Sequence, residues 1–219
     1  MNVNNTLILI SGPAASGKTT VVKKLVAYYK AKMKKPADCY IDIAKERGMP
    51  VEKAFTDIKR EEAEDRFCKI CKENSMVIGD QHLAIQFKRD SMMAVSNEIN
   101  DDKEEEYTPA ISKEFIEKLQ KNGVNVVVLL LYASPGVLLE RAKQRYKDIG
   151  HTVRNQSIEE VKREVEAERK FFATLMRENH LEGCEIRTDT KTEQEVYLDA
   201  LRKTVELGRK KASSIEWTR

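Results

Sequence analysis

Short apolar runs alternate with longer stretches of helical periodicity along this chain. The runs have the length and composition of buried strands, whereas the stretches between them repeat apolar residues at the spacing of amphipathic helices. This alternation is typical of a parallel sheet with crossover helices, so it predicts an α/β fold in a single domain, 1–219. The five expected strands lie at about 6–11, 39–43, 76–80, 125–132 and 184–188.

Several of the expected helices have recognisable ends. Ser134-Pro135 supplies an N-cap and a first-turn proline directly after the fourth run, and 157–160 and 192–195 have the residues of capping boxes. Thr108-Pro109 is expected to begin another helix, which Asn122-Gly123 would end. The helix that begins near 158 has an apolar stripe at helical spacing, which we interpret as core.

Composition narrows the class of protein. The 219 residues suffice for one domain with a sizeable core, and the net charge of +3 gives no reason to expect a nucleic-acid or membrane partner. The longest apolar runs are too short to span a bilayer, and the N-terminus lacks a secretory pattern, so a cytoplasmic location is expected. The four cysteines are expected to be free thiols, because Cys68-Lys-Ile-Cys71 has no second pair to complete a zinc site.

The segment between the first run and the first helical stretch reads Gly12-Pro-Ala-Ala-Ser-Gly17-Lys18-Thr19. This is a complete phosphate-binding loop motif, flanked by the strand and the helix that the motif requires. Backbone N–H groups of such a loop surround a phosphate chain, Lys18 neutralises its charge, and the Thr19 hydroxyl binds Mg²⁺. ATP and Mg²⁺ are therefore the expected cofactors. The expected cofactor-binding residues are Gly12, Pro13, Ala14, Ala15, Ser16, Gly17, Lys18, Thr19 and Thr20.

Acidic residues end two of the other runs. Asp80 ends the third run, and ligands in parallel sheets bind at the carboxyl ends of strands. If this strand neighbours the first, Asp80 lies beside the Mg²⁺ on Thr19 and can hold a metal-bound water. His82 lies on the same rim, either as a contact to the acceptor or as an ordinary loop residue. Asp42, at the end of the second run, would lie on the acceptor side or simply cap its strand.

Arginines form a further set after the fourth run. Arg141 and Arg145 are four residues apart and share one helix face, and Arg154 lies in the polar segment that follows. We expect the helix–loop–helix at about 141–157 to be a lid, because phosphoryl transfer needs permanently charged planar donors and protection from water. Arg169 lies beside an apolar stripe, where it either reaches a partner or extends to solvent. The expected catalytic residues are Lys18, Asp80, Arg141, Arg145 and Arg154.

With these motifs the chain resembles the P-loop kinases of the nucleoside-monophosphate kinase type, and most specifically the archaeal form of adenylate kinase. The resemblance covers nearly the whole chain, and the phosphate-binding motif is its most specific part. It implies a three-layer α/β/α fold with the strand order 2-3-1-4-5, lid arginines at the positions named above, and a segment near 188–191 that faces the adenine of ATP. The weaker matching pieces are Asp80 with His82, Tyr107-Thr-Pro109, Arg154-Asn155 and Arg169.

The same resemblance assigns acceptor binding to a helical segment at about 44–73, together with about 82–108. The chain departs from the family there, because the first stretch is shorter and the segment after His82 is longer. Arg60, or else Lys59, is the nearest candidate for the residue that holds an acceptor phosphate. The complete expected acceptor set is Asp42, Arg60, His82 and Arg169.

Three functions stay open. The main expectation is transfer of the γ-phosphoryl group of ATP to a small acceptor, foremost a nucleoside monophosphate (ATP + AMP = 2 ADP), which requires positioning and charge neutralisation rather than a strong base. The alternative is a kinase that phosphorylates a hydroxyl group of a small molecule or polynucleotide end, with Asp42 or Asp80 as the proton acceptor. The third is an ATPase switch or nucleotide-binding module, against which the arginine-bearing lid argues.

Overall fold

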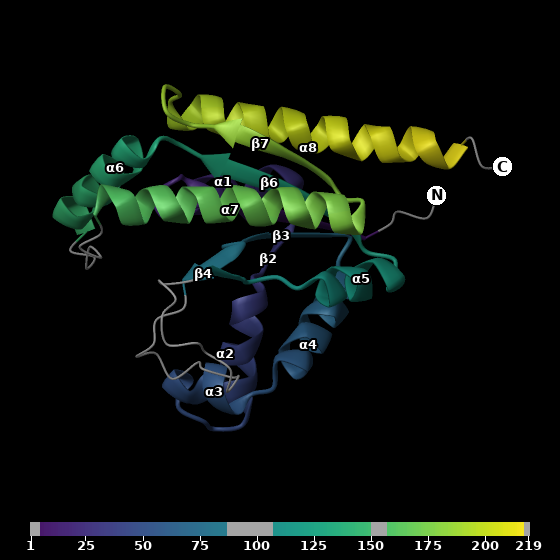
Figure 1. Ribbon diagram of the computed structural model, residues 1–219. Coiled ribbons are helices and arrows are strands. Elements are labelled where there is room, and N and C mark those ends of the chain that lie inside the picture. Colours follow the sequence, from purple (N-terminus) through teal and green to yellow (C-terminus); the bar gives the residue numbers. More distant parts are fainter. Residues whose placement is uncertain (1–4, 87–106, 150–156, 217–219) are drawn as a thin grey trace.

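A parallel five-stranded sheet forms the centre of the molecule. The computed structural model describes residues 5–86, 107–149 and 157–216 (Figure 1). The sheet has the order β2-β3-β1-β6-β7, so the predicted order 2-3-1-4-5 is confirmed. Thr6 of β1 pairs with Met76 of β3 on one side and with Asn125 of β6 on the other. The strands are β1 Thr6–Ser11, β2 Lys32–Met33, β3 Met76–Asp80, β6 Asn125–Tyr132 and β7 Glu182–Arg187.

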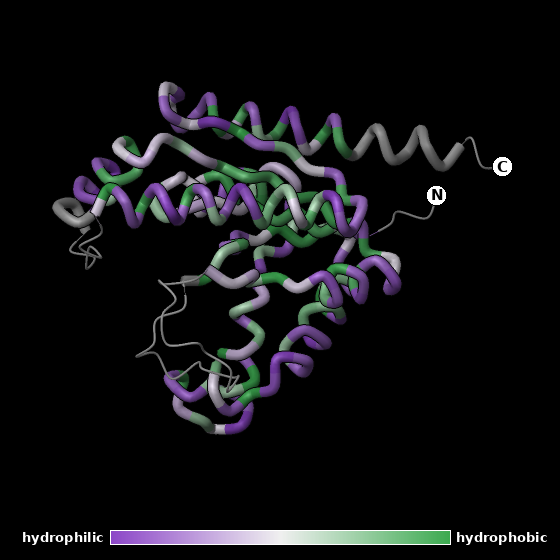
Figure 2. Tube along the Cα trace, in the orientation of Figure 1, coloured by the Kyte–Doolittle hydropathy of each residue, from purple (hydrophilic) through white to green (hydrophobic). Residues whose placement is uncertain are grey.

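Alternate residues of the central strands supply two cores, one on each face of the sheet. Ile8 and Ile10 of β1 pack with α1 (Lys18–Tyr29) and α8 (Glu193–Glu216). Leu7 and Leu9 pack instead with residues of α5 (Lys113–Lys121) and α7 (Ile158–Asn179). This period-two burial produces the predicted three layers, with apolar residues gathered in the central strands (Figure 2).

Helices on the β2 side of the sheet extend away from it (Figure 1). They are α2 (Pro36–Glu46), the 3₁₀ turn η1 (Val51–Lys53), α3 (Ala54–Asp57) and α4 (Arg60–Glu73). They contain the segment 44–73, for which acceptor binding stays a prediction. The short strands β4 (Ala84–Gln86) and β5 (Tyr107–Pro109) pair antiparallel and contact α7, and α6 (Pro135–Ile149) follows β6.

The sequence prediction was wrong at the second strand. Residues 39–43 lie inside α2, and the strand is the two-residue β2. Pro36 is the first helical residue, and the Asp38 carboxylate accepts a hydrogen bond from the backbone N–H of Lys35, so the helix begins before the apolar run. Cys39 and Ile43 are buried one helical turn apart, whereas the exposed residues of β2 have no apolar pattern.

Other boundaries differ less. The first, third and fourth strands match their predicted ranges, and the fifth is β7, which begins two residues before the expected start. Thr108-Pro109 does not begin a helix: it lies in β5, and α5 starts after Ser112, whose hydroxyl accepts from the Phe115 N–H. Most of the predicted lid loop, 150–156, and the segment 87–106 lie outside the described residues. Within the described ranges, none of the helices has the length and apolar character needed to cross a membrane.

Candidate functional site

The loop between β1 and α1 lies at the carboxyl end of the sheet. Gly12 has φ 140°, and a Cβ atom there would come within 1.9 Å of the Leu131 carbonyl oxygen, so the loop is pressed against the end of β6. Gly17 has φ 97° and is the N-cap of α1. These two backbone positions require glycine, and they leave the loop curled around the N-terminus of α1, where N–H groups favour an anion.

Lys18 is buried at the centre of this loop. Its ammonium group donates hydrogen bonds to the carbonyl oxygens of Gly12 (2.6 Å) and Pro13 (2.8 Å). Burial lowers the pKa of Lys18 to about 8, and the negative charges of Glu168, Glu164 and Asp80 offset only part of that effect. An anionic ligand beside the ammonium would supply the countercharge that the carbonyl groups do not.

Asp80 connects the loop to the β2–α2 junction. One carboxylate oxygen accepts a hydrogen bond from the Thr19 hydroxyl at 2.8 Å, and the other lies 2.5 Å from Lys35 Nζ. Burial alone would raise the pKa of Asp80, but the hydrogen bonds from Lys35 and Thr19 outweigh it and hold the pKa below its usual value. A hydroxyl and an ionised carboxylate side by side fit Mg²⁺, which prefers oxygen ligands and retains several waters. Among the residues described, no cluster of three metal-ligating side chains offers a different kind of metal site.

A cavity of about 740 Å³ opens in front of the loop. It brings together residues of the loop, the end of β3, the start of α2 and α6, so the predicted catalytic and cofactor-binding residues largely share one space. Its lining includes Ala14, Ala15, Ser16, Gly17, Lys18, Thr19, Thr20, Lys35, Asp80, His82, Arg141 and Arg145.

Two arginines of α6, Arg141 and Arg145, line this cavity. Arg141 donates hydrogen bonds to the Thr188 hydroxyl (2.9 Å) and carbonyl (2.6 Å), so the segment after β7 orients it. Arg145, further along α6, is exposed at the cavity rim. Arg154 lies outside the described residues, and its role as a lid arginine stays a prediction.

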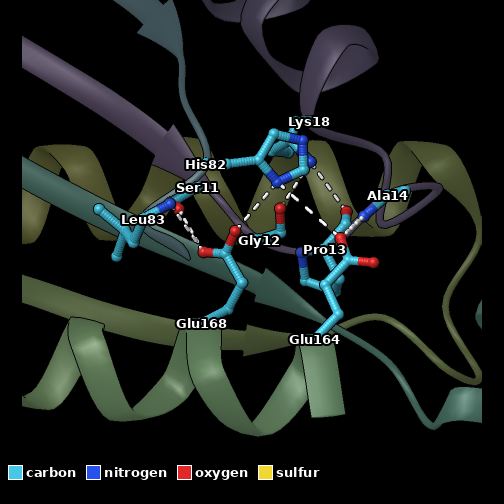
Figure 3. A network of polar contacts seen from close by, with 9 residues as sticks. All are labelled: Ser11, Gly12, Pro13, Ala14, Lys18, His82, Leu83, Glu164 and Glu168. Atoms are coloured by element: carbon cyan, nitrogen blue, oxygen red, sulfur yellow. Dashed lines mark hydrogen bonds and ion pairs between the residues drawn. The ribbon is translucent and has the colours of Figure 1, made fainter. Parts of the chain in front are cut away.

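Two glutamates of α7 are part of the site, and the sequence analysis missed both. Glu168 is fully buried and Glu164 is 6% exposed. Glu164 accepts a hydrogen bond from the Ala14 N–H at 2.8 Å, and Glu168 accepts from the Ser11 hydroxyl at 3.0 Å, so both hold the loop (Figure 3). Their spacing of four residues within the buried stripe of a helix was the available signal, because a charge there must have a partner.

Of the predicted acceptor residues, the structure places only His82 in this cavity. Asp42 was predicted at a strand end, but it lies in α2, pairs with Lys34 at 2.5 Å and lines a different cavity. Arg60 is at the exposed start of α4, where it pairs with Glu64 at 2.7 Å.

Arg169 also lies away from the loop cavity. It pairs with Glu185 of β7 at 2.9 Å, and its guanidinium carbon lies 4.9 Å from the centre of the Tyr132 ring. Of the two alternatives considered for this arginine, the first describes it: it reaches partners, which are Glu185 of β7 and the Tyr132 ring of β6. Its place in the expected acceptor set stays a prediction.

Comparisons with known proteins identify the fold. No protein-family model and no curated protein sequence matches the chain. Solved structures do: a gluconokinase from Sinorhizobium meliloti 1021 is 14% identical and has a TM-score of 0.51, and the match covers 96% of this chain and 98% of that one. The YorR protein of Bacillus subtilis, solved in complex with phosphorylated GDP, is 17% identical with a TM-score of 0.54, over 93% and 97% of the two chains.

A third solved structure has the same fold. Shikimate kinase from Aquifex aeolicus vf5 is 16% identical with a TM-score of 0.50, over 91% of this chain and 96% of that one. At such identities the likeness shows the fold alone, an α/β fold that this chain shares with the gluconokinase and the shikimate kinase.

Proposed function

We propose that this protein is an ATP-dependent kinase that transfers the γ-phosphoryl group to a hydroxyl group of a small molecule. The observation that carries the proposal is the single cavity in which Lys18, Thr19, Asp80 and the α6 arginines meet. Phosphoryl transfer depends on positioning and on neutralising the charge of the moving group, and these residues supply both.

ATP and Mg²⁺ fit the residues present. The N–H groups of the loop and Lys18 would hold the phosphate chain, and Arg141 and Arg145 would face it from α6. Thr19 would bind Mg²⁺ and Asp80 would hold one of its waters, because these two side chains already share a hydrogen bond. Held by these two residues, Mg²⁺ would supply charge neutralisation for the phosphate chain.

A hydroxyl acceptor is favoured over a phosphate acceptor by the charges next to His82. Two buried carboxylates, Glu164 and Glu168, border that part of the site, and they would repel an acceptor phosphate. Two of the structures with the same fold are a gluconokinase and a shikimate kinase, whose named acceptors carry hydroxyl groups. Small hydroxy acids and polyols are therefore the acceptors to test first.

A nucleoside monophosphate acceptor is the second candidate. The YorR protein, which shares the fold, was solved with a phosphorylated nucleotide bound. The adenylate kinase resemblance also assigns acceptor binding to the helical segment 44–73, and this assignment is an untested part of the second candidate. Adenylate kinase activity has a distinctive signature, because such an enzyme converts ADP alone into ATP and AMP.

The test is a coupled assay of ADP release with ATP and Mg²⁺, run with gluconate, shikimate, glycerol, each nucleoside monophosphate, and buffer alone. We expect ADP release that depends on a hydroxyl acceptor, and a loss of at least about 10²-fold in Lys18→Ala, as for other preorganised charge donors. Lys121→Ala, which removes an exposed lysine of α5, is the control and should retain full activity. Equal ADP release with and without every acceptor would instead identify an ATPase.

A further inference from the structure

Two consecutive lysines at the β2–α2 junction line different cavities. Lys34 Nζ lies 2.5 Å from a carboxylate oxygen of Asp42, in the cavity that the phosphate-binding loop does not share. Lys35 Nζ lies instead 2.5 Å from Asp80, and Lys35 lines the cavity in front of the loop. The proposed kinase function uses Lys18 of this cavity but gives no role to Lys35.

The backbone of Lys35 is held in place by the elements around it. The N–H of Lys34 donates a hydrogen bond to the Ile78 carbonyl oxygen of β3 at 3.2 Å. A Cβ atom on Gly79 would come within 2.2 Å of the Lys34 carbonyl oxygen, so glycine lets the junction lie directly against β3. The Asp38 carboxylate accepts a hydrogen bond from the Lys35 N–H at 3.0 Å. The backbone that carries this lysine is therefore fixed before a ligand binds.

The ammonium group of Lys35 can bind an anion without leaving Asp80. An ammonium group has three N–H donors, and among the described residues Asp80 is the one acidic partner of Lys35. The Lys35 side chain is 34% exposed, whereas that of Asp80 is 6% exposed. Donors of Lys35 therefore remain for an oxygen ligand in the cavity.

The charges in the cavity suit a polyanion. Of its described lining residues, five are lysines or arginines, whereas Asp80 is the one carboxylate. The charge of Lys35 also reaches Lys18: burial is the main cause of the lowered pKa of Lys18, and repulsion from Lys35 is a smaller cause. An anion that contacts both ammonium groups would relieve this repulsion.

We propose that Lys35 is a catalytic residue whose ammonium group binds the terminal phosphoryl group of ATP from the α2 side of the cavity. The proposal rests on the proposed kinase function and adds a residue to its site. Lys18 holds the phosphate chain from the loop, and Arg141 and Arg145 line the cavity from α6. Lys35 supplies a cation from a third element of the structure.

Lys35 acts on charge and not on bonds. During transfer the acceptor hydroxyl oxygen bonds to the γ-phosphorus, and the bond from that phosphorus to the β–γ bridging oxygen breaks. The electron pair of the broken bond leaves with ADP, and the hydroxyl proton passes to water. The moving group has negative charge on its three outer oxygens, and a fixed ammonium group beside them stabilises that charge.

The first test measures nucleotide binding and needs no acceptor. Calorimetry with Mg²⁺ compares ADP with a β,γ-imido analogue of ATP, which has the terminal phosphate but does not transfer it. Lys35→Met should lower the affinity for the analogue at least about tenfold, as expected for the loss of a charged hydrogen bond, and change the affinity for ADP less than about threefold. Retained ADP binding shows that the variant is folded. An unchanged ratio of the two affinities would overturn the proposal.

A second background separates contact with the phosphate from an effect on Asp80. Without Lys35, the Asp80 carboxylate loses its ion-pair partner, and its charge then repels the nucleotide. The same affinity ratio is therefore measured for Asp80→Asn with and without Lys35→Met. If Lys35 contacts the phosphate, its removal lowers the ratio in both backgrounds. A loss that occurs only when Asp80 is present contradicts the proposal.

The matched control is Lys34→Met. It removes the neighbouring lysine and an ion pair of the same 2.5 Å length, but in the other cavity, so it should keep wild-type affinities and kinetics. With gluconate, shikimate and glycerol as acceptor probes, Lys35→Met should lower kcat at saturating ATP at least about tenfold. Lys35→Arg, which keeps the charge, should recover part of that loss. An unchanged kcat in Lys35→Met would refute the catalytic role.

Failure of this proposal and failure of the proposed function give different results. A wild-type protein that binds neither nucleotide is not the kinase proposed above. If the wild type binds both nucleotides and Lys35→Met leaves their affinity ratio unchanged, the kinase function stands and Lys35 has no part in it.

Discussion

Lys18 should make the stability of the protein depend on pH in an unusual direction. Burial lowers its pKa from about 10.5 to about 8. Between these two values the unfolded chain retains the proton and the folded protein has lost it, so the contribution of Lys18 to the free energy of unfolding rises with pH. Below pH 8 both states are charged, and the folded state bears the full cost of the buried ammonium.

The magnitude follows from the width of the pH window. From pH 8 to pH 9.5 the gain is about 1.4 kcal/mol for each pH unit, or roughly 2 kcal/mol in total. The four cysteine thiols work in the opposite direction, because burial raises the pKa of each and stability falls as the unfolded thiols ionise. The measurement must therefore compare two variants that share these thiols.

The assay is urea unfolding of wild type and Lys18→Met at pH 7.0 and pH 9.5, without nucleotide. We expect the wild type to gain about 2 kcal/mol relative to Lys18→Met between these pH values. The control is Lys121→Met, at an exposed position. The difference in free energy of unfolding between wild type and this variant should not change with pH. If the difference in free energy of unfolding between wild type and Lys18→Met stays constant within about 0.5 kcal/mol over this pH range, the ammonium is not buried at a cost. Adding ATP with Mg²⁺ should shrink the gain, because phosphate charges favour the ammonium.

Three further predictions concern residues whose surroundings differ. Gly12→Ala should weaken ATP binding at least tenfold in calorimetry, since its Cβ would lie 1.9 Å from the Leu131 carbonyl oxygen; wild-type affinity would show that the loop can move at no cost. Thr19→Val should remove the strengthening of ATP binding by Mg²⁺ while the Mg²⁺-free affinity changes less than threefold, and a retained Mg²⁺ effect would place the metal elsewhere. Arg169→Ala should leave kcat and KM within twofold. It should lower the free energy of unfolding by at most about 1 kcal/mol, because the pair with Glu185 is partly exposed. A larger fall in kcat would indicate that Arg169 acts in the acceptor site after all.

Local features of the sequence were enough to predict the phosphate-binding part of the site. The loop motif, the preceding strand and the following helix are contiguous, so their mutual geometry depends on backbone bonds within 24 residues, Thr6–Tyr29. Asp80 could also be placed, because parallel neighbours end at the same edge of a sheet, and Ile10 of β1 indeed pairs with Asp80.

The second strand shows where local pattern fails. Residues 39–43 are apolar enough for either a strand or a buried helix turn, and periodicity cannot separate the two over so short a run. Pro36 and Asp38, which start α2, were the better signal. Once this segment is helical, Asp42 can no longer lie at a strand end, and it pairs with Lys34 instead.

By itself the sequence determined the α/β alternation and the phosphate-binding loop with its lysine and threonine, because these depend on residues close together in the chain. Only the tertiary structure decided that Glu164, Glu168 and Lys35 also face that site. Glu164 reaches Ala14 across 150 positions of sequence, and Lys35 reaches Asp80 across the β2–β3 edge. Such contacts form only when whole helices and strands pack together around the sheet. The residue pattern of one helix does not show which residues of another element it will contact.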